Sequence, residues 1–296
     1  MVVDKPVGPT SHDVVDAVRR AFHERRVGHT GTLDPFASGV LPVCVGQATR
    51  LARFLTDGEK AYHATVRLGF ATDTDDRTGA PLSEPRSVDV ADEAVRAACA
   101  RLVGTLPQVP PAFSAKKVDG ERLYALARAG RAVPREAVTV TVHAIELRSR
   151  DGDALELDVR CAAGTYVRAL ARDLGEILGT GGHLTALRRT RSGGFGLDEA
   201  VPLDRVGDAG SLRPLEVLLT DWPSVRVGAR GAAELGFGRS LSRDLTDEAW
   251  PAAVAHVRVL SNDGRLLAIA VPRGGSAPDA PLPVPASLHP EIVFAR

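Results

Sequence analysis

Apolar residues recur at helical spacing in several parts of the chain. After residues 9–13, which carry a hydroxyl cap followed by an acid three positions later, apolar side chains at 14, 15, 18 and 22 predict a helix. Residues 47–56 repeat this spacing. We expect further helices at about 90–103 and 165–178, the second ending near a glycine.

Alternation of apolar and polar residues predicts the strands. Residues 61–70 alternate strictly, which is typical of a half-buried strand. Two more strands are expected at about 137–148 and 153–161, joined by an Asp-Gly-Asp turn. A hairpin is predicted between 253–261 and 265–272, because Asn-Asp-Gly separates these two apolar runs.

The remaining segments indicate loops and a boundary between two domains. Residues 27–39 contain three glycines and a proline, so we expect them to form a loop. Residues 71–94 are acidic, and we expect them to form a solvated loop. The character of the chain changes after about residue 205. We therefore place one domain over residues 1–215, with a proline-rich and then basic insertion at about 105–136, and a small β-rich domain over 222–296.

Composition limits the possible classes of function. Lys plus Arg and Asp plus Glu both total 37, so the formal net charge is zero and the chain is not globally basic, although one face can still be. No apolar run reaches the length of a membrane span, and the amino-terminal residues do not resemble a signal peptide. The 3 cysteines are far apart, which argues against a zinc site or a disulfide framework. We expect a cytoplasmic protein that does not bind a membrane.

Candidate chemistry is concentrated in one loop. The chain lacks the phosphate-binding, metalloprotease, nucleophile-elbow and deaminase motifs, so we expect neither a metal nor a cofactor. Asp34 stands among Gly28, Gly31, Pro35 and Gly39, and a carboxylate on such a stiff loop can be presented to a ligand at low entropic cost. On local sequence alone, Leu-Asp-Pro is more simply interpreted as a turn.

The longer string around Asp34 changes that balance, because it closely resembles the catalytic loop of the TruB family of tRNA pseudouridine-55 synthases. Four other segments resemble motifs of the same family in the same order, and together they cover about residues 4–191. The five segments are Asp4-Lys5-Pro6 and its following residues to Ser11, the loop 28–42, Lys60-Ala61-Tyr62 with Arg67-Leu68-Gly69, the stretch from Gln108-Val109-Pro110-Pro111 to Arg128, and Gly164-Thr165-Tyr166-Val167-Arg168 with Leu187-Arg188-Arg189.

The resemblance implies roles for the residues of a uridine pocket. Asp34 would be the catalytic carboxylate, acting either as a nucleophile at C1′ or as a base at C2′. Arg168 would pair with it, although without the motif a surface helix residue is the simpler interpretation. Tyr62 would stack on the target base, and Tyr166 and Leu187 would wall the pocket; a purely core role is the alternative for all three.

The resemblance also implies contacts with RNA. His29 would lie close to the extruded nucleotides, and Lys5 would support the pocket floor, unless Lys5 merely forms a surface ion pair with Asp4. Basic residues of the insertion would meet phosphates, with an ordinary solvated charge run as the alternative. These are Lys116, Lys117, Arg122 and Arg128. The implied partner is the T-arm stem-loop of tRNA, bound by a monomer.

The fold that the resemblance implies is of the α+β class. It consists of a pseudouridine synthase catalytic domain with a central, largely antiparallel sheet, an RNA-binding insertion, and a small PUA-like module at 222–296. The expected activity is isomerisation of uridine 55 in the T-loop to pseudouridine on a flipped-out nucleotide. Two alternatives stay open: a tRNA-folding chaperone that binds the elbow, and a pseudouridine synthase for another RNA.

Overall fold

The computed structural model describes residues 1–113, 117–118, 121–122, 135–208, 210–246, 248, 250–251, 254–274 and 285–294. The chain divides into two compact units, Met1–Cys44 with Leu55–Ser211, and Val45–Phe54 with Leu212–Arg296. The second unit thus takes in a segment that the expected boundary at 215 places in the first. Its physical basis is the Phe54 ring, which packs edge-on against Trp222 and His256.

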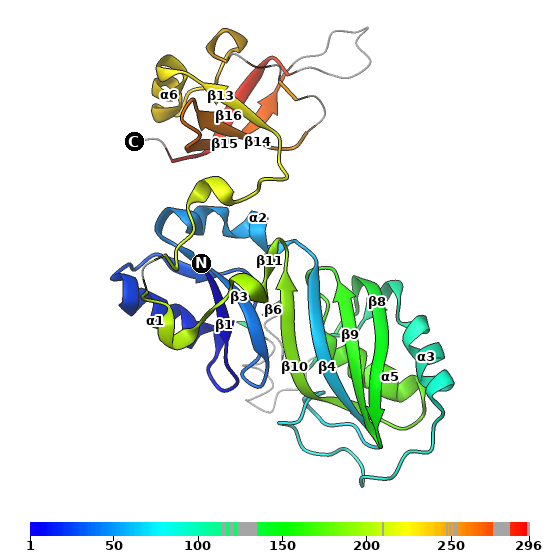
Figure 1. Ribbon diagram of the computed structural model, residues 1–296. Coiled ribbons are helices and arrows are strands. Elements are labelled where there is room, and N and C mark those ends of the chain that lie inside the picture. Colours follow the sequence, from blue (N-terminus) through cyan, green and yellow to red (C-terminus); the bar gives the residue numbers. More distant parts are fainter. Residues whose placement is uncertain are drawn as a thin grey trace, which may run out of the picture. The chain divides into compact units, whose positions relative to one another are not determined.

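A ten-stranded sheet dominates the first unit (Figure 1). Its order is β12-β1-β3-β10-β4-β9-β8-β5, with β2 beside β3 and β11 beside β10. The pairs β1–β12 and β3–β10 are parallel, whereas β1–β3, β10–β4, β4–β9, β9–β8 and β8–β5 are antiparallel. The expected α+β class with a largely antiparallel central sheet is confirmed. The strands are β1 (Val2–Lys5), β2 (Val27–His29), β3 (Ser38–Val45), β4 (Lys60–Leu68), β5 (Gly104–Gln108), β8 (Val138–Asp151), β9 (Ala154–Cys161), β10 (Gly182–Ser192), β11 (Phe195–Gly196) and β12 (Val201–Pro202).

Three of these strands differ from the sequence prediction. Residues 27–39 are not wholly a loop, because β2 and the start of β3 bound it on either side. The basic stretch at 188–191 belongs to β10, a central strand. Its arginines interrupt the apolar alternation, which hid the strand, yet Arg189 is only 2% exposed and serves as an interior residue.

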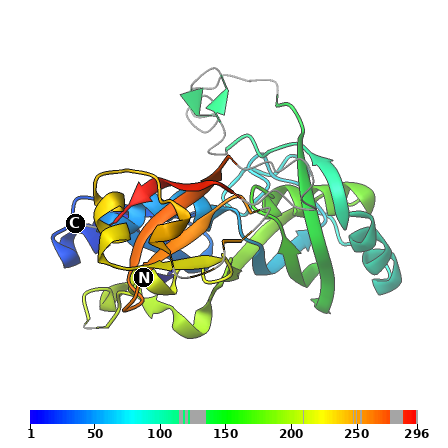
Figure 2. The same cartoon turned by 90° about the horizontal axis from the view of Figure 1, so that it is seen from above.

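Helices pack against this sheet and fix its loops. α1 (Ser11–Phe22) begins with a full capping box, in which Thr10 and Asp13 exchange hydrogen bonds. α5 (Val167–Ile177) packs against β10 and β4, and α3 (Asp92–Arg101) packs against β8 and α5 (Figure 1 and Figure 2). These three helices confirm the predictions from helical spacing. The 47–56 segment divides into a 3-10 turn, Gly46–Leu51, and the short α2 (Ala52–Thr56).

The second unit contains a four-stranded sheet of order β13-β14-β15-β16, drawn in yellow to red in Figure 2. The predicted hairpin is present, because β14 and β15 pair in antiparallel fashion around the Asn-Asp-Gly turn. Valines, leucines and Trp250 form its core, together with Leu235 of α6. Its elements are β13 (Ser224–Val227), α6 (Ala229–Gly236), β14 (Val257–Ser261), β15 (Leu266–Arg273) and β16 (Ser287–Val293). A separate two-stranded hairpin, β6 (Lys117–Val118) with β7 (Glu121–Arg122), lies in the insertion.

Gly39 allows β3 and β10 to approach closely. Its φ is +105°, and a Cβ atom at this position would lie 2.1 Å from the carbonyl oxygen of Arg189. We expect Gly39→Ala to lower the free energy of unfolding by more than about 2 kcal/mol, because it combines backbone strain with a clash against main chain. Urea denaturation followed by circular dichroism measures this loss.

The matched control is Gly152→Ala. Gly152 also has a positive φ, +57°, but nothing lies within 4 Å of the added methyl group. It should show the strain alone, about 1 kcal/mol. Equal losses in the two variants would contradict the close approach of β3 and β10.

Candidate active site

A cavity of about 250 Å³ lies in the first unit, between the loop that follows β2 and the start of α5. Strands β4 and β10 supply its other walls. Its lining residues are Gly31, Thr32, Leu33, Asp34, Thr56, Lys60, Tyr62, Ala162, Ala163, Gly164, Thr165, Tyr166, Val167, Arg168, Leu187 and Arg189. The cavity therefore brings together Asp34, Tyr62, Tyr166, Arg168 and Leu187, five of the residues that the sequence singled out.

The loop that carries Asp34 is held in place by backbone hydrogen bonds. The Asp34 carbonyl accepts a bond from Ala37 N at 3.0 Å, and Pro35 occupies the second position of this turn. The Ser11 hydroxyl, at the start of α1, donates to Leu33 O at 3.0 Å and accepts from Leu33 N at 2.8 Å. Leu-Asp-Pro is thus a turn and also presents its carboxylate to a cavity, so the two interpretations of this segment coexist.

Arg168 binds the Asp34 carboxylate with two hydrogen-bonding nitrogens. Its Nε lies 3.0 Å from Oδ2, and its Nη2 donates to Oδ1 at 3.2 Å. The Arg168 side chain is 6% exposed and that of Asp34 is 32% exposed. Paired atoms in this geometry aim the carboxylate as well as neutralising it. The alternative of Arg168 as a surface helix residue is wrong, because the side chain is buried.

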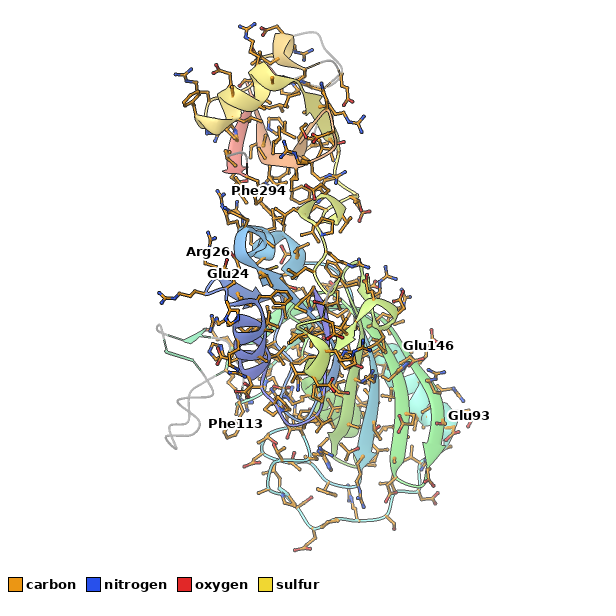
Figure 3. All side chains as sticks on the ribbon, turned by 60° about the vertical axis from the view of Figure 1, so that its left-hand side comes forward. Glu24, Arg26, Glu93, Phe113, Glu146 and Phe294 are labelled. Atoms are coloured by element: carbon orange, nitrogen blue, oxygen red, sulfur yellow. The ribbon has the colours of Figure 1, made fainter. Side chains whose placement is uncertain are left out.

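Other groups complete the surroundings of Arg168. Its Nη1 donates to Thr74 O at 3.1 Å, and its Nη2 donates to the carbonyl of Phe113, the residue labelled in Figure 3, at 2.9 Å. Its Nη1 also lies 3.5 Å from Asp76 Oδ2. The guanidinium is therefore fixed between two carboxylates and two carbonyls, which leaves it little freedom to leave Asp34.

Asp76 is a site residue that the sequence analysis missed. It lies in the acidic segment 71–94, which was expected to be solvated, yet its side chain is 5% exposed. The hydroxyls of Thr74 and Thr78 both donate to its Oδ1, and neighbouring Asp75 pairs with Arg172 at 3.0 Å. Threonines alternating with aspartates were the available signal, because short hydroxyl side chains can satisfy a buried carboxylate locally.

Arg189 is the second residue that was missed, and it fixes the backbone of the cavity. It lies on β10 directly opposite Tyr62 of β4. Its guanidinium donates to three carbonyls, of Val40 at 2.7 Å, Gly31 at 3.1 Å and Thr32 at 3.4 Å. An arginine inside an otherwise apolar strand is the sequence signal for such a structural cation.

Burial determines the direction of the pKa shifts in the site. It raises the pKa of Asp34, and the Arg168 guanidinium opposes this rise. Burial also raises the pKa of Tyr62, so its phenol stays protonated at neutral pH. Asp34 is therefore more basic than an ordinary aspartate, which suits either attack on carbon or proton removal.

Lys5 and His29 do not line the cavity. Lys5 is fully buried, and its Nζ donates to the carbonyls of Pro6 at 2.9 Å and Pro9 at 2.7 Å, so the alternative of a surface pair with Asp4 is wrong. Asp4 instead pairs with Arg188 at 2.8 Å. Burial lowers the pKa of the His29 imidazole, which lies on β2. Both residues thus lie outside the lining of the cavity.

Of the four basic residues predicted to contact RNA in the insertion, two lie within the described part of the chain. Lys116 and Arg128 lie outside the described residues. For Lys117 and Arg122 the structure gives the backbone alone, which places them opposite each other in the β6–β7 hairpin. Their proposed contacts with phosphates therefore stay predictions.

Metal-ligating side chains are not gathered anywhere in the described part of the chain: it holds no group of three or more His, Cys, Asp or Glu residues arranged for a metal ion. Cys44, Cys99 and Cys161 are buried and free. Among the described residues, no helix is long and apolar enough to cross a membrane.

The three carbonyls bound by Arg189 lead to a test of the scaffold. We expect Arg189→Met to lower the free energy of unfolding by about 3–5 kcal/mol, because it leaves those carbonyls unsatisfied next to the Asp34 loop. Arg191→Met, on the same strand but exposed, should change it by less than about 0.5 kcal/mol. Chemical denaturation measures both, and similar values for the two variants would contradict the structural role of Arg189.

Comparison with known proteins shows which family the chain belongs to. The model of the TruB family pseudouridylate synthase N-terminal domain matches residues 19–167, and that of the tRNA pseudouridylate synthase B C-terminal domain matches residues 168–219. A protein of Thermobifida fusca named tRNA pseudouridine synthase B is 47% identical over 100% of this chain and 98% of its own length. One of the same name from Aromatoleum aromaticum is 44% identical over 91% of this chain and 87% of its own.

Solved structures show the same fold. A Cbf5-Nop10-Gar1 complex contains a chain with a TM-score of 0.72 and 27% identity, covering 99% of this chain and 84% of that one. A chain in an H/ACA RNP bound to a substrate RNA containing 2′-deoxyuridine has a TM-score of 0.74 and 24% identity, covering 100% and 85%. The resemblance carried by the five motifs is confirmed: this chain belongs to the TruB family of pseudouridylate synthases.

Proposed function

We propose that the protein isomerises uridine 55 in the T-loop of tRNA to pseudouridine, with Asp34 as the catalytic carboxylate. The pairing of Asp34 with Arg168 inside the cavity is the observation that carries this proposal. The names of the relatives from Thermobifida fusca and Aromatoleum aromaticum support tRNA as the substrate. The T-loop site rests on the resemblance of the motifs.

The reaction moves the base from a nitrogen to a carbon bond. The C1′–N1 bond breaks, the uracil turns within the pocket, and C5 bonds to C1′. One carboxylate is sufficient because the leaving base is reused and no water is added. Asp34 either attacks C1′ or takes the C2′ proton, and in both routes it must be ionised.

The cavity residues divide the remaining tasks. A cavity of about 250 Å³ admits a single nucleotide rather than paired bases, so the target uridine has to be flipped out. Tyr62 would stack on its base, and Tyr166 and Leu187 would close over it. Tyr166 is well placed for this, since Gln108 binds its backbone N–H and carbonyl at 2.9 and 3.2 Å.

The parts of the chain away from the cavity would hold the RNA. We propose that the insertion at 105–136 grips the T-arm through Lys116, Lys117, Arg122 and Arg128, and that His29 contacts extruded nucleotides. The second unit is proposed to be a PUA-like module, consistent with its small sheet. We also propose that a monomer carries out the reaction.

Asp34→Asn tests the assignment of the carboxylate. With an unmodified tRNA transcript and no other addition, the wild-type protein should convert uridine 55, and the variant should be slower by at least about 1,000-fold while binding the tRNA within about 3-fold. Nucleoside analysis measures turnover, and filter binding measures affinity. Normal turnover by the variant would overturn the mechanism, and modification of rRNA fragments but not of an isolated T-arm would overturn the substrate.

The pH dependence of the rate tests the Asp34–Arg168 pair. Because Asp34 must be ionised and burial raises its pKa above 3.8, the rate should fall as the pH falls through that raised pKa. Arg168→Gln removes the group that opposes the rise, so the acid limb should move to higher pH and the plateau should drop. Single-turnover rates across the acid range measure this.

The control is Arg172→Gln. Arg172 stands one turn further along α5 and pairs with Asp75 rather than Asp34. In Arg172→Gln, the acid limb of the pH–rate profile should coincide with that of the wild type. A limb that stays in place in Arg168→Gln would show that Arg168 does not govern the ionisation of Asp34.

A further inference from the structure

Lys60 is a buried cation in the cavity wall that the proposed mechanism does not use. It opens β4, lines the cavity and is 5% exposed. Its Nζ donates to the carbonyl of Thr56 at 3.0 Å. Among the described residues, no carboxylate lies within ion-pair distance of this ammonium group. Of its three N–H donors, therefore, one is used.

An ammonium in this state is costly. Removing such a group from water costs several kcal/mol unless a counter-charge or a full set of acceptors compensates. Lys5, the other fully enclosed lysine, illustrates the satisfied case, because two carbonyls bind it and it stays outside the cavity. Lys60 faces the cavity with spare donors, which points to an acceptor supplied by the ligand.

The other cations of the cavity are already occupied. Arg168 binds Asp34, Asp76 and the carbonyls of Thr74 and Phe113. The Arg189 guanidinium donates to three carbonyls, those of Val40 in β3 and of Gly31 and Thr32 in the loop. Among the lining residues in the described part of the chain, Lys60 is thus the cation with a single carbonyl partner and no carboxylate within ion-pair distance.

The position of Lys60 indicates which part of the substrate it meets. Lys60 and Tyr62 are two residues apart on β4, so they share the face that is turned to the cavity. A base stacked on the Tyr62 ring would present its polar edge to neighbouring side chains of that face. The ring oxygens of uracil are acceptors, which match the unused N–H groups of Lys60.

We propose that Lys60 donates a hydrogen bond from Nζ to a ring carbonyl oxygen of the target uracil, and stabilises the negative charge that the base acquires when the C1′–N1 bond breaks. This role rests on the proposed function. The electron pair of the broken bond passes to N1 and is shared with O2 and O4. When C5 bonds to C1′, that charge is consumed; the C5 proton then leaves and N1 gains one. Lys60 keeps its proton throughout.

The requirement for such a group follows from the rest of the site. In either route the negative charge of Asp34 is consumed as the C1′–N1 bond breaks and passes to the departing base, so the base needs a positive group close to it in the cavity. A positive donor fixed before the reaction stabilises that charge without reorganisation, and removing one such donor commonly costs about 100-fold or more in rate.

Lys60→Met tests the proposal at saturating tRNA. It keeps the length of the side chain and removes the charge and the donors. We expect a single-turnover rate at least about 100-fold lower, with tRNA affinity and thermal midpoint close to wild type. Arg67→Met is the matched control, because it removes one positive charge from the same strand at an exposed position, and it should keep the wild-type rate. An unchanged rate in Lys60→Met, or a loss confined to tRNA affinity as expected for a phosphate contact, would overturn the proposal.

A substrate with a better leaving base separates a chemical role from a structural one. Fluorine at C5 withdraws electrons and stabilises the departing base, so a tRNA with 5-fluorouridine at the target position needs Lys60 less. The rate deficit of Lys60→Met, measured as loss of the 5-fluorouridine nucleoside, should shrink by at least about 10-fold. Equal deficits on both substrates would show that Lys60 only supports the fold. Should Lys60→Met not fold, Lys60→Gln provides the same comparison.

The alkaline pH dependence gives an independent readout. Burial lowers the pKa of Lys60 to about 8; Arg189 on β10 acts in the same direction, whereas Asp57 and Cys161 oppose it. The wild-type kcat/KM reports ionisations of the free enzyme. It should fall as the pH rises through about 8, because Lys60 loses its proton and with it the positive charge that would stabilise the departing base. Lys60→Gln should lack this decline. Lys5 has a pKa of about 8 as well, so a decline that persists in Lys60→Gln would assign it to Lys5 and count against the proposal.

Failure of this proposal and failure of the proposed function give different results. If the wild-type protein converts no uridine in tRNA, or Asp34→Asn is fully active, the function itself is wrong. If the wild-type is active, Asp34→Asn is inactive and Lys60→Met matches Arg67→Met, only the role of Lys60 is wrong.

Discussion

The bidentate pair of Asp34 and Arg168 is the interaction on which the site depends. A carboxylate that lines a cavity and is partly removed from water is costly to ionise, and a buried guanidinium is costly to leave unpaired. Each group compensates the other, and the two atom pairs also fix the direction of the carboxylate. Since Asp34 belongs to a loop and Arg168 to a helix 134 residues later in the chain, the site exists only once the sheet between them has folded.

Buried polar side chains of the surrounding elements hold the Asp34 loop rigid through hydrogen bonds. Arg189 binds carbonyls at both ends of the Asp34 loop, and Ser11 binds Leu33 through both its backbone groups. Such bonds stabilise little in net terms, but breaking one leaves an unsatisfied group in the interior. The loop therefore keeps its conformation because any other conformation would leave buried polar groups without hydrogen bonds. A segment with three glycines can therefore hold the Asp34 carboxylate in one orientation, as the proposed catalytic role requires.

Sequence patterns predicted what depends on local spacing and missed what depends on distant contacts. The strand at 61–70 and the helix near 165–178 show clean periodicities, because one face of each is buried and the other is not. The strand at 182–192 was hidden because Arg189 looks like a surface residue until its three carbonyl partners are known. Asp76 was assigned to a solvated loop for the same reason: its partners Thr74 and Thr78 are local, but its charged partner Arg168 is distant in the sequence. Ordered motifs located Asp34, Tyr62 and Arg168, which periodicity alone could not.

The buried cations in the described part of this protein are of two kinds. One kind binds main-chain carbonyls and holds the backbone, and the other lies at the proposed active site. Arg189 and Lys5 direct their donors at main-chain carbonyls, so their charge is used in holding the backbone. Arg168 binds the carboxylate of Asp34, which we propose to be catalytic, and is itself held by Asp76. Lys60, by contrast, lines the cavity and donates to one carbonyl, and it has no carboxylate within ion-pair distance among the described residues. Burying the Lys60 ammonium group with one acceptor is costly in free energy. A substrate that supplies a further acceptor explains why the charge is present. The proposed departure of uracil calls for such a partner, because the electron pair of the broken C1′–N1 bond leaves a negative charge on the base that a fixed positive donor stabilises.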